Sequence, residues 1–246
     1  MLIYDKVVPL NRHTHRRLRL RTSHHDARFA AELNSVPLTT VEFPHAAGEY
    51  AIVFARLENG DFLPAVVVGL RNQQNLYVDE NARWKRGYVP AFLRQYPFML
   101  AEDRDSGTVT VCIDVAYDGL SEQEGDALFT ESGEDGETLG RAMGFLQELH
   151  GEFKRTASFT AKLKELNLLD QQVIRFGGEG EPQRELGGVH VVSEERLQQL
   201  TDEQAVDLFK SGALGLIYTH LLSMRNLDRL SELAQQQAAA PAAAAN

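Results

Sequence analysis

The residues best suited to molecular recognition lie in one short segment, residues 76–98. It contains the only tryptophan of the chain, three of its seven tyrosines and four cationic residues. Aromatic rings and arginine contribute most of the energy at protein binding surfaces. We therefore predict that this segment forms a binding site for a protein or small molecule, made by Trp84, Tyr88, Arg94 and Tyr96.

The same segment can also belong to a hydrophobic core. Phe92, Leu93 and Phe98 are apolar, and Trp84 is large enough to close one end of a sheet. The two interpretations can hold for different rings. The sequence alone leaves open whether Trp84 lies in the core or at the surface.

A second candidate is a basic arm, residues 12–28, which carries six arginines against a single acid, Asp26. Arginine alternates with leucine over residues 17–21, so a strand here would place Arg17, Arg19 and Arg21 on one face. Arginine suits carboxylate and phosphate groups, which gives an anion-binding hypothesis. The favoured alternative is that the arm is solvated or pairs with the acidic stretch 102–137, because charge runs are mostly solvated faces.

Metal binding is not expected at the histidines of this arm or elsewhere. The arginines around them repel a cation, and the spacing is not that of a zinc site. Glu42, His45 and Glu49 form another possible trio, but Pro44 and Gly48 predict a loop there rather than a metal cage. The arm histidines are His13, His15, His24 and His25.

Motifs for catalysis are also missing from the sequence. Cys112 lies in an apolar stretch, where a cysteine is most often a small buried side chain, so we expect a buried, reduced thiol. The chain has no Gly-x-Ser-x-Gly or Ser-x-x-Lys motif, and the glycine-rich residues 177–182 lack the Lys-Ser/Thr of a phosphate loop. We expect no cofactor and assign no catalytic residue, although an enzyme is not excluded.

Strands are predicted through the first half of the chain. Asn59-Gly60 is a strong hairpin signal between two of them, and the unbroken apolar run Val66–Val68 predicts a strand covered on both faces. The predicted strands span residues 2–10, 50–57, 62–70, 75–79 and 108–115.

The second half is predicted to be mainly helical. Apolar residues at steps of three and four form a stripe over residues 137–169, with a possible break near Thr156. Two strands, 173–176 and 189–193, precede a helix capped by Ser193. A capping box opens the next helix at Thr201, and a last helix spans residues 213–233.

These elements predict an α+β fold. A mostly antiparallel sheet from the N-terminal half carries the helices of the C-terminal half. We expect one domain over residues 1–233, followed by a Gln/Ala-rich tail, 234–246, that is disordered because it has little to bury.

Composition limits the classes of function. The net charge of −10 opposes general nucleic-acid binding, because a phosphate backbone would be repelled. No apolar run approaches the length of a membrane span, and no secretory signal is evident. With a single cysteine the chain forms no internal disulfide, which suits the cytoplasm. The oligomeric state is left open.

Several stretches resemble the SapC family of bacterial proteins. They are residues 33–44, the aromatic segment 76–98 with its run Tyr88-Val-Pro-Ala-Phe-Leu-Arg94, and residues 212–230. The resemblance covers most of the chain. It implies a link to surface-layer loci and brings no established catalytic residue.

From the residues and this resemblance together we expect a soluble, cytoplasmic binding or accessory factor for cell-envelope or transport systems. One alternative is an enzyme, or an enzyme subunit, with a pocket at the aromatic segment. Another is an anion-binding regulator that uses the basic arm.

Overall fold

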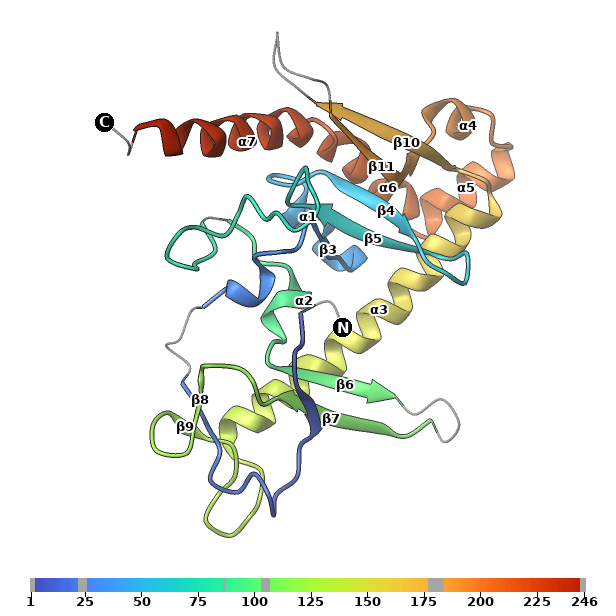
Figure 1. Ribbon diagram of the computed structural model, residues 1–246. Coiled ribbons are helices and arrows are strands. Elements are labelled where there is room, and N and C mark those ends of the chain that lie inside the picture. Colours follow the sequence, from blue (N-terminus) through green and yellow to red (C-terminus); the bar gives the residue numbers. More distant parts are fainter. Residues whose placement is uncertain (1–2, 22–25, 86, 103–106, 177–183, 244–246) are drawn as a thin grey trace. The chain divides into compact units, whose positions relative to one another are not determined.

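The structure is a computed structural model (Figure 1). It describes residues 3–21, 26–85, 87–102, 107–176 and 184–243. The chain divides into two compact units, each assembled from three segments. The first unit consists of residues 1–30, 78–84 and 91–151, and the second of residues 31–77, 85–90 and 152–246. The single domain expected above stays a prediction.

The first unit contains two small antiparallel sheets (Figure 1). One has the strand order β1-β7-β6, and the other places β2 between β8 and β9. Two short helices, η1 (Arg28–Ala30) and α2 (Ala91–Arg94), belong to the same unit. The strands are β1 (Val7–Pro9), β2 (Arg19–Leu20), β6 (Phe98–Glu102), β7 (Val109–Asp114), β8 (Leu120–Ser121) and β9 (Asp126–Ala127).

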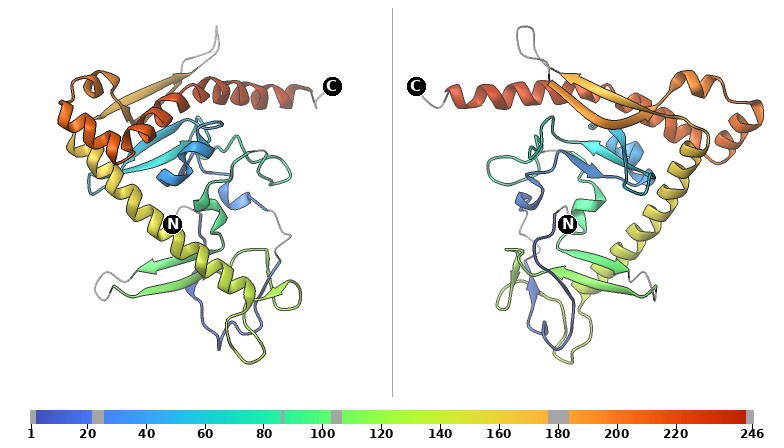
Figure 2. Two further views of the ribbon diagram at one scale, coloured as in Figure 1. Left: turned by 180° about the vertical axis from the view of Figure 1, so that it is seen from behind. Right: turned by 45° about the vertical axis from the view of Figure 1, so that its right-hand side comes forward.

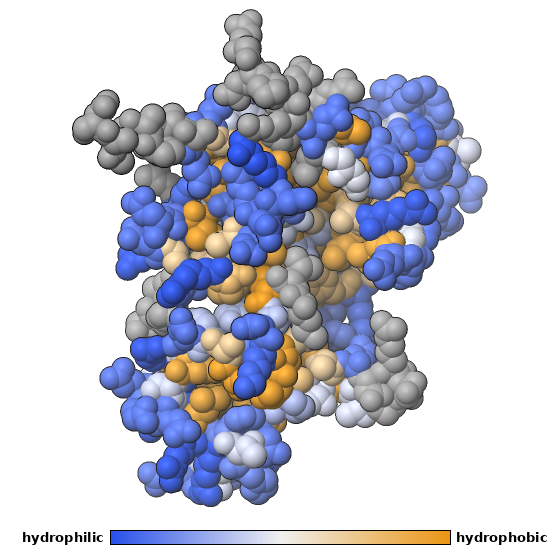
Figure 3. All heavy atoms as spheres, in the orientation of Figure 1, coloured by the Kyte–Doolittle hydropathy of each residue, from blue (hydrophilic) through white to orange (hydrophobic). Residues whose placement is uncertain are grey.

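The core of the first unit forms between the sheets and the long helix α3 (Glu137–Glu165). Leu139 and Leu146 of the helix pack with residues of β6 and β7, and Leu18 and Leu20 of the basic arm pack against this cluster. The leucines of the alternating run therefore face the core of this unit. Some of the partly buried apolar side chains of the unit contribute to the orange areas of the surface in Figure 3.

Cys112 lies on β7 and is buried, with 5% of its surface exposed. Burial raises the pKa of its thiol, because the thiolate would lose its hydration. The predicted burial of this side chain is confirmed.

The second unit is built on a five-stranded antiparallel sheet of order β10-β11-β4-β5-β3. Its centre is the predicted hairpin, with Gly60 in the left-handed region at φ 80°. Val66, Val67 and Val68 are buried, as the unbroken apolar run predicts. The strands are β3 (Ser35–Pro37), β4 (Ile52–Arg56), β5 (Phe62–Val67), β10 (Leu169–Phe176) and β11 (Arg184–Val192).

Helices of the second unit lie beside this sheet (Figure 2). Ser193 caps α4 through its side chain, and Thr201 forms a capping box with Gln204 at the start of α5, both as predicted. None of the helices in the described ranges is both long and apolar enough to span a bilayer. Besides the end of α3, from residue 152 onward, the helices of the second unit are η2 (Thr40–Glu42), α1 (Phe43–Ala46), α4 (Glu194–Gln198), α5 (Asp202–Lys210), α6 (Ala213–Ser223) and α7 (Asn226–Ala243).

The α+β class is confirmed, but several elements differ from the prediction. The strand expected at 75–79 is replaced by a turn, in which the Asn75 side chain accepts the Tyr77 N–H, with a single bridge between Val78 and Trp84. Helix α3 continues through Thr156, because the buried Thr156 hydroxyl accepts a hydrogen bond from the Thr40 N–H at 2.9 Å.

The end of the chain also differs. The predicted helix 213–233 is divided into α6 and α7, and α7 continues to Ala243. Alanine and glutamine have high helix propensity, which explains the length of α7. The disorder expected for residues 234–246 stays a prediction.

Two neighbouring strands of the five-stranded sheet pair directly over only a short distance. β11 and β4 are registered at Val189↔Ala55 and His190↔Phe54. Continuing this register by two residues would place Val192 opposite Ile52.

His220 of α6 connects the strands at that point. The Val192 N–H donates to Nε2 of the ring at 3.0 Å, and Nδ1 lies 2.8 Å from the Ile52 carbonyl oxygen. Because Nε2 accepts, the proton of the neutral ring must be on Nδ1, which donates to Ile52. Ser223 adds a second link, since its hydroxyl accepts the Ile52 N–H at 3.0 Å and donates to the His220 carbonyl at 2.6 Å.

This arrangement requires a neutral ring. Burial lowers the pKa of His220 to about 4, and the hydrogen bond to Ile52 offsets only part of that effect. In the unfolded chain the pKa returns to about 6.5. The stabilisation is therefore complete above about pH 6.5 and is lost as the pH falls toward about 4.

The substitution His220→Gln should remove this pH dependence, because the glutamine amide can donate and accept hydrogen bonds but does not titrate. Between about pH 7.5 and pH 4.5, the wild-type protein should lose roughly 2 kcal/mol more unfolding free energy than the variant. Urea melts of both proteins at the two pH values measure the difference, and other titrating groups cancel in the comparison. Equal losses in both proteins would contradict a buried neutral His220.

Candidate functional site

The aromatic segment contributes Tyr96 to a group of four rings in the first unit. The Tyr96 ring stacks on Phe29 with centroids 4.1 Å apart and an interplanar angle of 20°. Tyr117 meets it edge-on at 5.0 Å, and Tyr4 lies 5.5 Å away. All four rings are half-buried. We call Tyr4, Phe29, Tyr96 and Tyr117 the aromatic cluster.

A buried carboxylate organises one side of this cluster. Asp114, at the end of β7, has no exposed surface. It accepts hydrogen bonds from the backbone N–H groups of Asp5 at 2.8 Å, Lys6 at 2.9 Å and Ala116 at 3.0 Å. The Tyr96 hydroxyl donates a fourth, longer hydrogen bond of 3.3 Å. The carboxylate thus fixes the N-terminal segment and Tyr96 at the end of one strand.

The ionisation of these groups follows from their surroundings. Burial alone would raise the pKa of Asp114, but the four hydrogen bonds together outweigh it and lower that pKa. Burial, followed by the charge of Asp114, raises the pKa of Tyr4 and of Tyr96. At neutral pH the aspartate is ionised and the tyrosines are protonated. The cluster can therefore stack and hydrogen-bond, but its acid and phenols do not exchange protons readily near neutrality.

The end of the basic arm borders the aromatic cluster. Arg28 pairs with Asp26 at 2.5 Å and approaches Asp118 at 3.8 Å. Burial raises the pKa of Tyr117, with Asp26 the next cause, while the positive charge of Arg21 lowers it. The fold thus brings charged groups from the arm next to Tyr117, although the arm and the aromatic segment are far apart in sequence.

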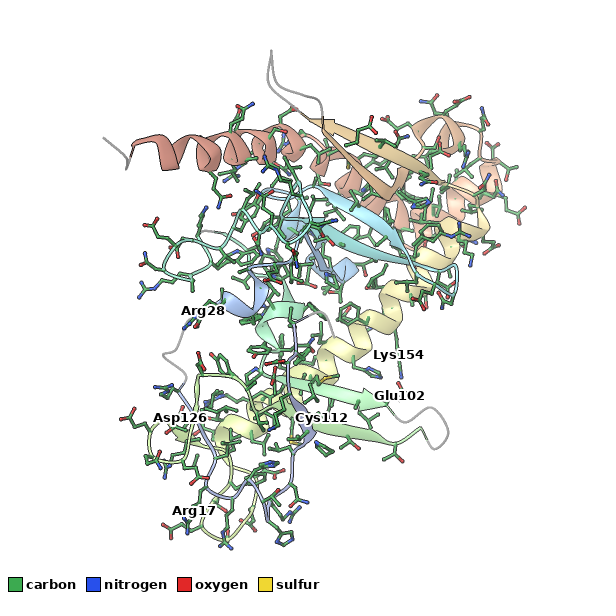
Figure 4. All side chains as sticks on the ribbon, in the orientation of Figure 1. Arg17, Arg28, Glu102, Cys112, Asp126 and Lys154 are labelled. Carbon is green, nitrogen blue, oxygen red and sulfur yellow. The ribbon has the colours of Figure 1, made fainter. Side chains whose placement is uncertain are left out.

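Closer to its start, the arm lies against the acidic stretch. Strand β2 pairs with β8 and β9, and the Arg19 guanidinium donates to the Gly125 carbonyl at 3.0 Å. Arg16 donates to the Glu131 carbonyl and Arg21 to the Asp118 carbonyl. The arginines thus use backbone oxygens of the acidic stretch more than its carboxylates. Arg17 is exposed (Figure 4), and His24 and His25 lie outside the described residues.

The other predicted site residues have contacts that differ from those of Tyr96. Trp84 is half-buried and bridges Val78, and Arg94 is exposed, with its guanidinium 5.1 Å from the Phe145 ring centroid. Trp84 and Arg94 belong to the first unit together with Tyr96, whereas Tyr88 belongs to the second unit.

Tyr88 also contacts a buried carboxylate, that of Glu42. Its hydroxyl donates to Glu42 at 2.9 Å, its N–H donates to Glu49 at 3.1 Å, and its ring stacks on His45 at 5.5 Å. Gly87 has φ +85° and lies so close to Glu49 that a Cβ would come within 1.5 Å of that carboxylate. Another residue here would be strained by the positive φ and would displace the Glu49 carboxylate from its hydrogen bond to the Tyr88 N–H.

Of the trio, Glu42 and His45 lie in the short helices η2 and α1 rather than in the predicted loop, and Glu49 lies in the turn that follows. The reason is local: Thr39 and Glu42 form a capping box, in which the buried Glu42 carboxylate accepts from the Thr39 N–H at 2.9 Å and the Thr39 hydroxyl at 2.6 Å. Within the ranges that the structure describes, no three His, Cys, Asp or Glu side chains are arranged to hold a metal ion.

Sequence reasoning did not identify Asp114, Tyr4 or Phe29 as neighbours of Tyr96. An acid at the end of an apolar strand is a usable signal, because a buried carboxylate must find several donors. The donors themselves, Asp5 and Lys6, are more than a hundred positions away and carry no such signal.

Comparison with known proteins gives one match. The family model described as SapC matches residues 10–230 of the 246-residue chain. No curated protein and no solved structure shows a significant match.

Removing the buried charge should cost more than removing the phenol that contacts it. Asp114→Asn turns one acceptor oxygen into a donor that faces backbone N–H groups, so we expect a loss of about 2–4 kcal/mol. Tyr96→Phe removes one long hydrogen bond and should cost about 1 kcal/mol. Urea denaturation measures both. Losses of equal size would show that Asp114 does not anchor the N-terminal segment.

Neutralising the arm should change stability only modestly. In the triple variant Arg17→Gln, Arg19→Gln and Arg21→Gln we expect a small loss, on the order of 1 kcal/mol per exposed interaction at most, that shrinks at high salt. A thermal scan with and without polyphosphate tests the anion-site hypothesis at the same time. A large, saturable rise in Tm that occurs in the wild type and not in the triple variant would favour an anion site over pairing within the chain.

Proposed function

The chain belongs to the SapC family, and on this premise we propose that it is a cytoplasmic binding or accessory factor for bacterial cell-envelope or transport systems. The resemblance supports the envelope link through the association of the family name with surface-layer loci. The molecular role is supported by the first unit, where the half-buried aromatic cluster lies beside charged residues.

The observation that carries this proposal is the stacking of Phe29 on Tyr96 beside Tyr117. Half-buried rings already held by their neighbours lose little conformational freedom when a partner binds, so they provide contact area at low entropic cost. Arg28 and Arg94, both exposed, add guanidinium groups in the same unit. Aromatic rings combined with arginine are the residue types that dominate binding energies.

Binding is favoured over catalysis by the ionisation of these groups. A general acid or base is most effective with a pKa near the working pH. Here the pKa of Asp114 is lowered and the pKa values of Tyr4 and Tyr96 are raised, both away from neutrality. The groups thus resist proton transfer. An enzyme or enzyme subunit with a pocket at the aromatic segment, residues 84–96, remains the second hypothesis.

The anion-regulator hypothesis has less support. The guanidinium groups of Arg19 and Arg21 donate to carbonyls of the acidic stretch. An anion would have to displace or share these contacts, with acidic residues close by.

The proposal is tested by recovering partners from the native bacterial host. Tagged wild-type chain, the double variant Phe29→Ala/Arg94→Ala and the control Arg141→Ala are purified in parallel, and co-purifying proteins are quantified by mass spectrometry. Arg141 is a matched control because it is an exposed arginine of the first unit, paired with Glu137. We expect an envelope or transport component to be enriched with wild type and control and reduced at least about tenfold with the double variant.

Two results would contradict the proposal. The first is equal recovery of the same component with the double variant, which would remove the aromatic cluster from the interaction. The second is a set of partners without any envelope or transport protein. Urea melts of the variants confirm that any loss of binding does not come from unfolding.

A further inference from the structure

Helix α6 of the second unit has an unusual composition for a surface helix. Its eleven residues include no Asp, Glu, Lys or Arg, although the chain as a whole carries a net charge of −10. A helix that is apolar on all sides is normally buried on all sides. α6 buries one face, formed by Ala213, Ile217, His220 and Ser223.

The opposite face of α6 is exposed. Tyr218 and Leu222, one turn apart, are 52% and 65% exposed, and a Cβ on nearby Gly215 would meet no atom within 4 Å. α5, which packs against α6, exposes Phe209 at 73% and Val206 at 48%. The two helices lie in front of the five-stranded sheet in the left view of Figure 2. We call the exposed side of α6, with Tyr218, Leu222 and Gly215, the outer α6 surface.

The apolar area is of the size expected for an interface. Tyr218 and Leu222 each leave on the order of 100 Å² exposed, so two copies would bury roughly 400 Å² from these two side chains. An interface that extends to Phe209 and Val206 of α5 would bury roughly 800 Å² from the four side chains. Three half-buried leucines of α6, Leu214, Leu216 and Leu221, add to this area. The sum approaches the lower range of stable interfaces, about 1,200 Å².

The absence of charged residues on α6 indicates what kind of partner binds the outer α6 surface. In a two-fold dimer each surface meets itself, so a charged residue near the axis faces its own kind. For an acidic chain most of the surface would therefore be repulsive against a second copy. α6 avoids this cost along its whole length, and the nearest exposed cations, Lys210 and Arg225, lie beyond its two ends. The neighbouring helix α5 carries three acids, of which Asp207, next to Val206, is paired with Lys162 at 3.0 Å.

We propose that the outer α6 surface binds a second copy of this chain, with the two α6 helices antiparallel about a two-fold axis. Tyr218 is the central residue of α6, so the axis places it against its counterpart in the other copy. Gly215 lets the backbones approach closely at both ends of the contact. This proposal concerns the second unit and does not depend on the proposed function.

The test is the mass of the full chain in solution, measured by sedimentation equilibrium between about 1 and 100 µM, a range that covers the dissociation constants of moderate dimers. We expect a dimer of the 27.5 kDa chain, whose association strengthens with salt because screening reduces the repulsion between acidic copies. Tyr218→Glu should weaken association at least about tenfold. Val41→Glu should leave it unchanged, because Val41 is a 58% exposed apolar residue elsewhere in the same unit.

A second pair of variants checks the two-fold geometry. Tyr218→Lys alone should also weaken the dimer, and an equimolar mixture of Tyr218→Lys and Tyr218→Glu should restore association, since opposite charges then meet at the axis. The proposal is overturned by a wild-type chain that is monomeric at the highest concentration. It is also overturned by a dimer that Tyr218→Glu leaves intact, by a dimer that Val41→Glu weakens equally, or by a mixture that stays monomeric.

Discussion

His220 has no access to water, so both nitrogens of its ring must be satisfied inside the protein. They are satisfied by the Val192 N–H and the Ile52 carbonyl, at the place where β11 and β4 would otherwise continue their ladder. One side chain of α6 therefore fixes the helix on the sheet and joins the C-terminal strands to the N-terminal hairpin. The position of α6, and with it the exposed side of that helix, depends on this bridge.

The first unit meets the same constraint with a carboxylate. Asp114 cannot be left buried without donors, and the N–H groups of Asp5, Lys6 and Ala116 supply them. The cost of burying the charge is offset by these hydrogen bonds, and the N-terminal segment is fixed as a result. The Tyr96 hydroxyl completes the set, so the ring that stacks on Phe29 is oriented by the same aspartate. In this unit Asp114 thus both fixes the N-terminal segment and orients Tyr96 of the candidate site.

Tyr88 and Tyr96 belong to one sequence motif but are held by different acids. Each donates its hydroxyl to a buried acid, Glu42 for Tyr88 and Asp114 for Tyr96. The two acids belong to different compact units. A segment that alternates between units thus gives its two tyrosines different hydrogen-bond partners.

Local signals determined much of this protein from the sequence alone. The Asn59-Gly60 hairpin and the capping residues Ser193 and Thr201 depend on residues a few positions apart, and each was predicted. Only the tertiary structure decided which distant groups satisfy the buried polar side chains. Asp114 and Asp5 are 109 positions apart, and His220 and Ile52 are 168 apart. Any backbone N–H or carbonyl can fill such a role chemically, so no residue type marks it in the sequence, and the choice is made only when the chain packs.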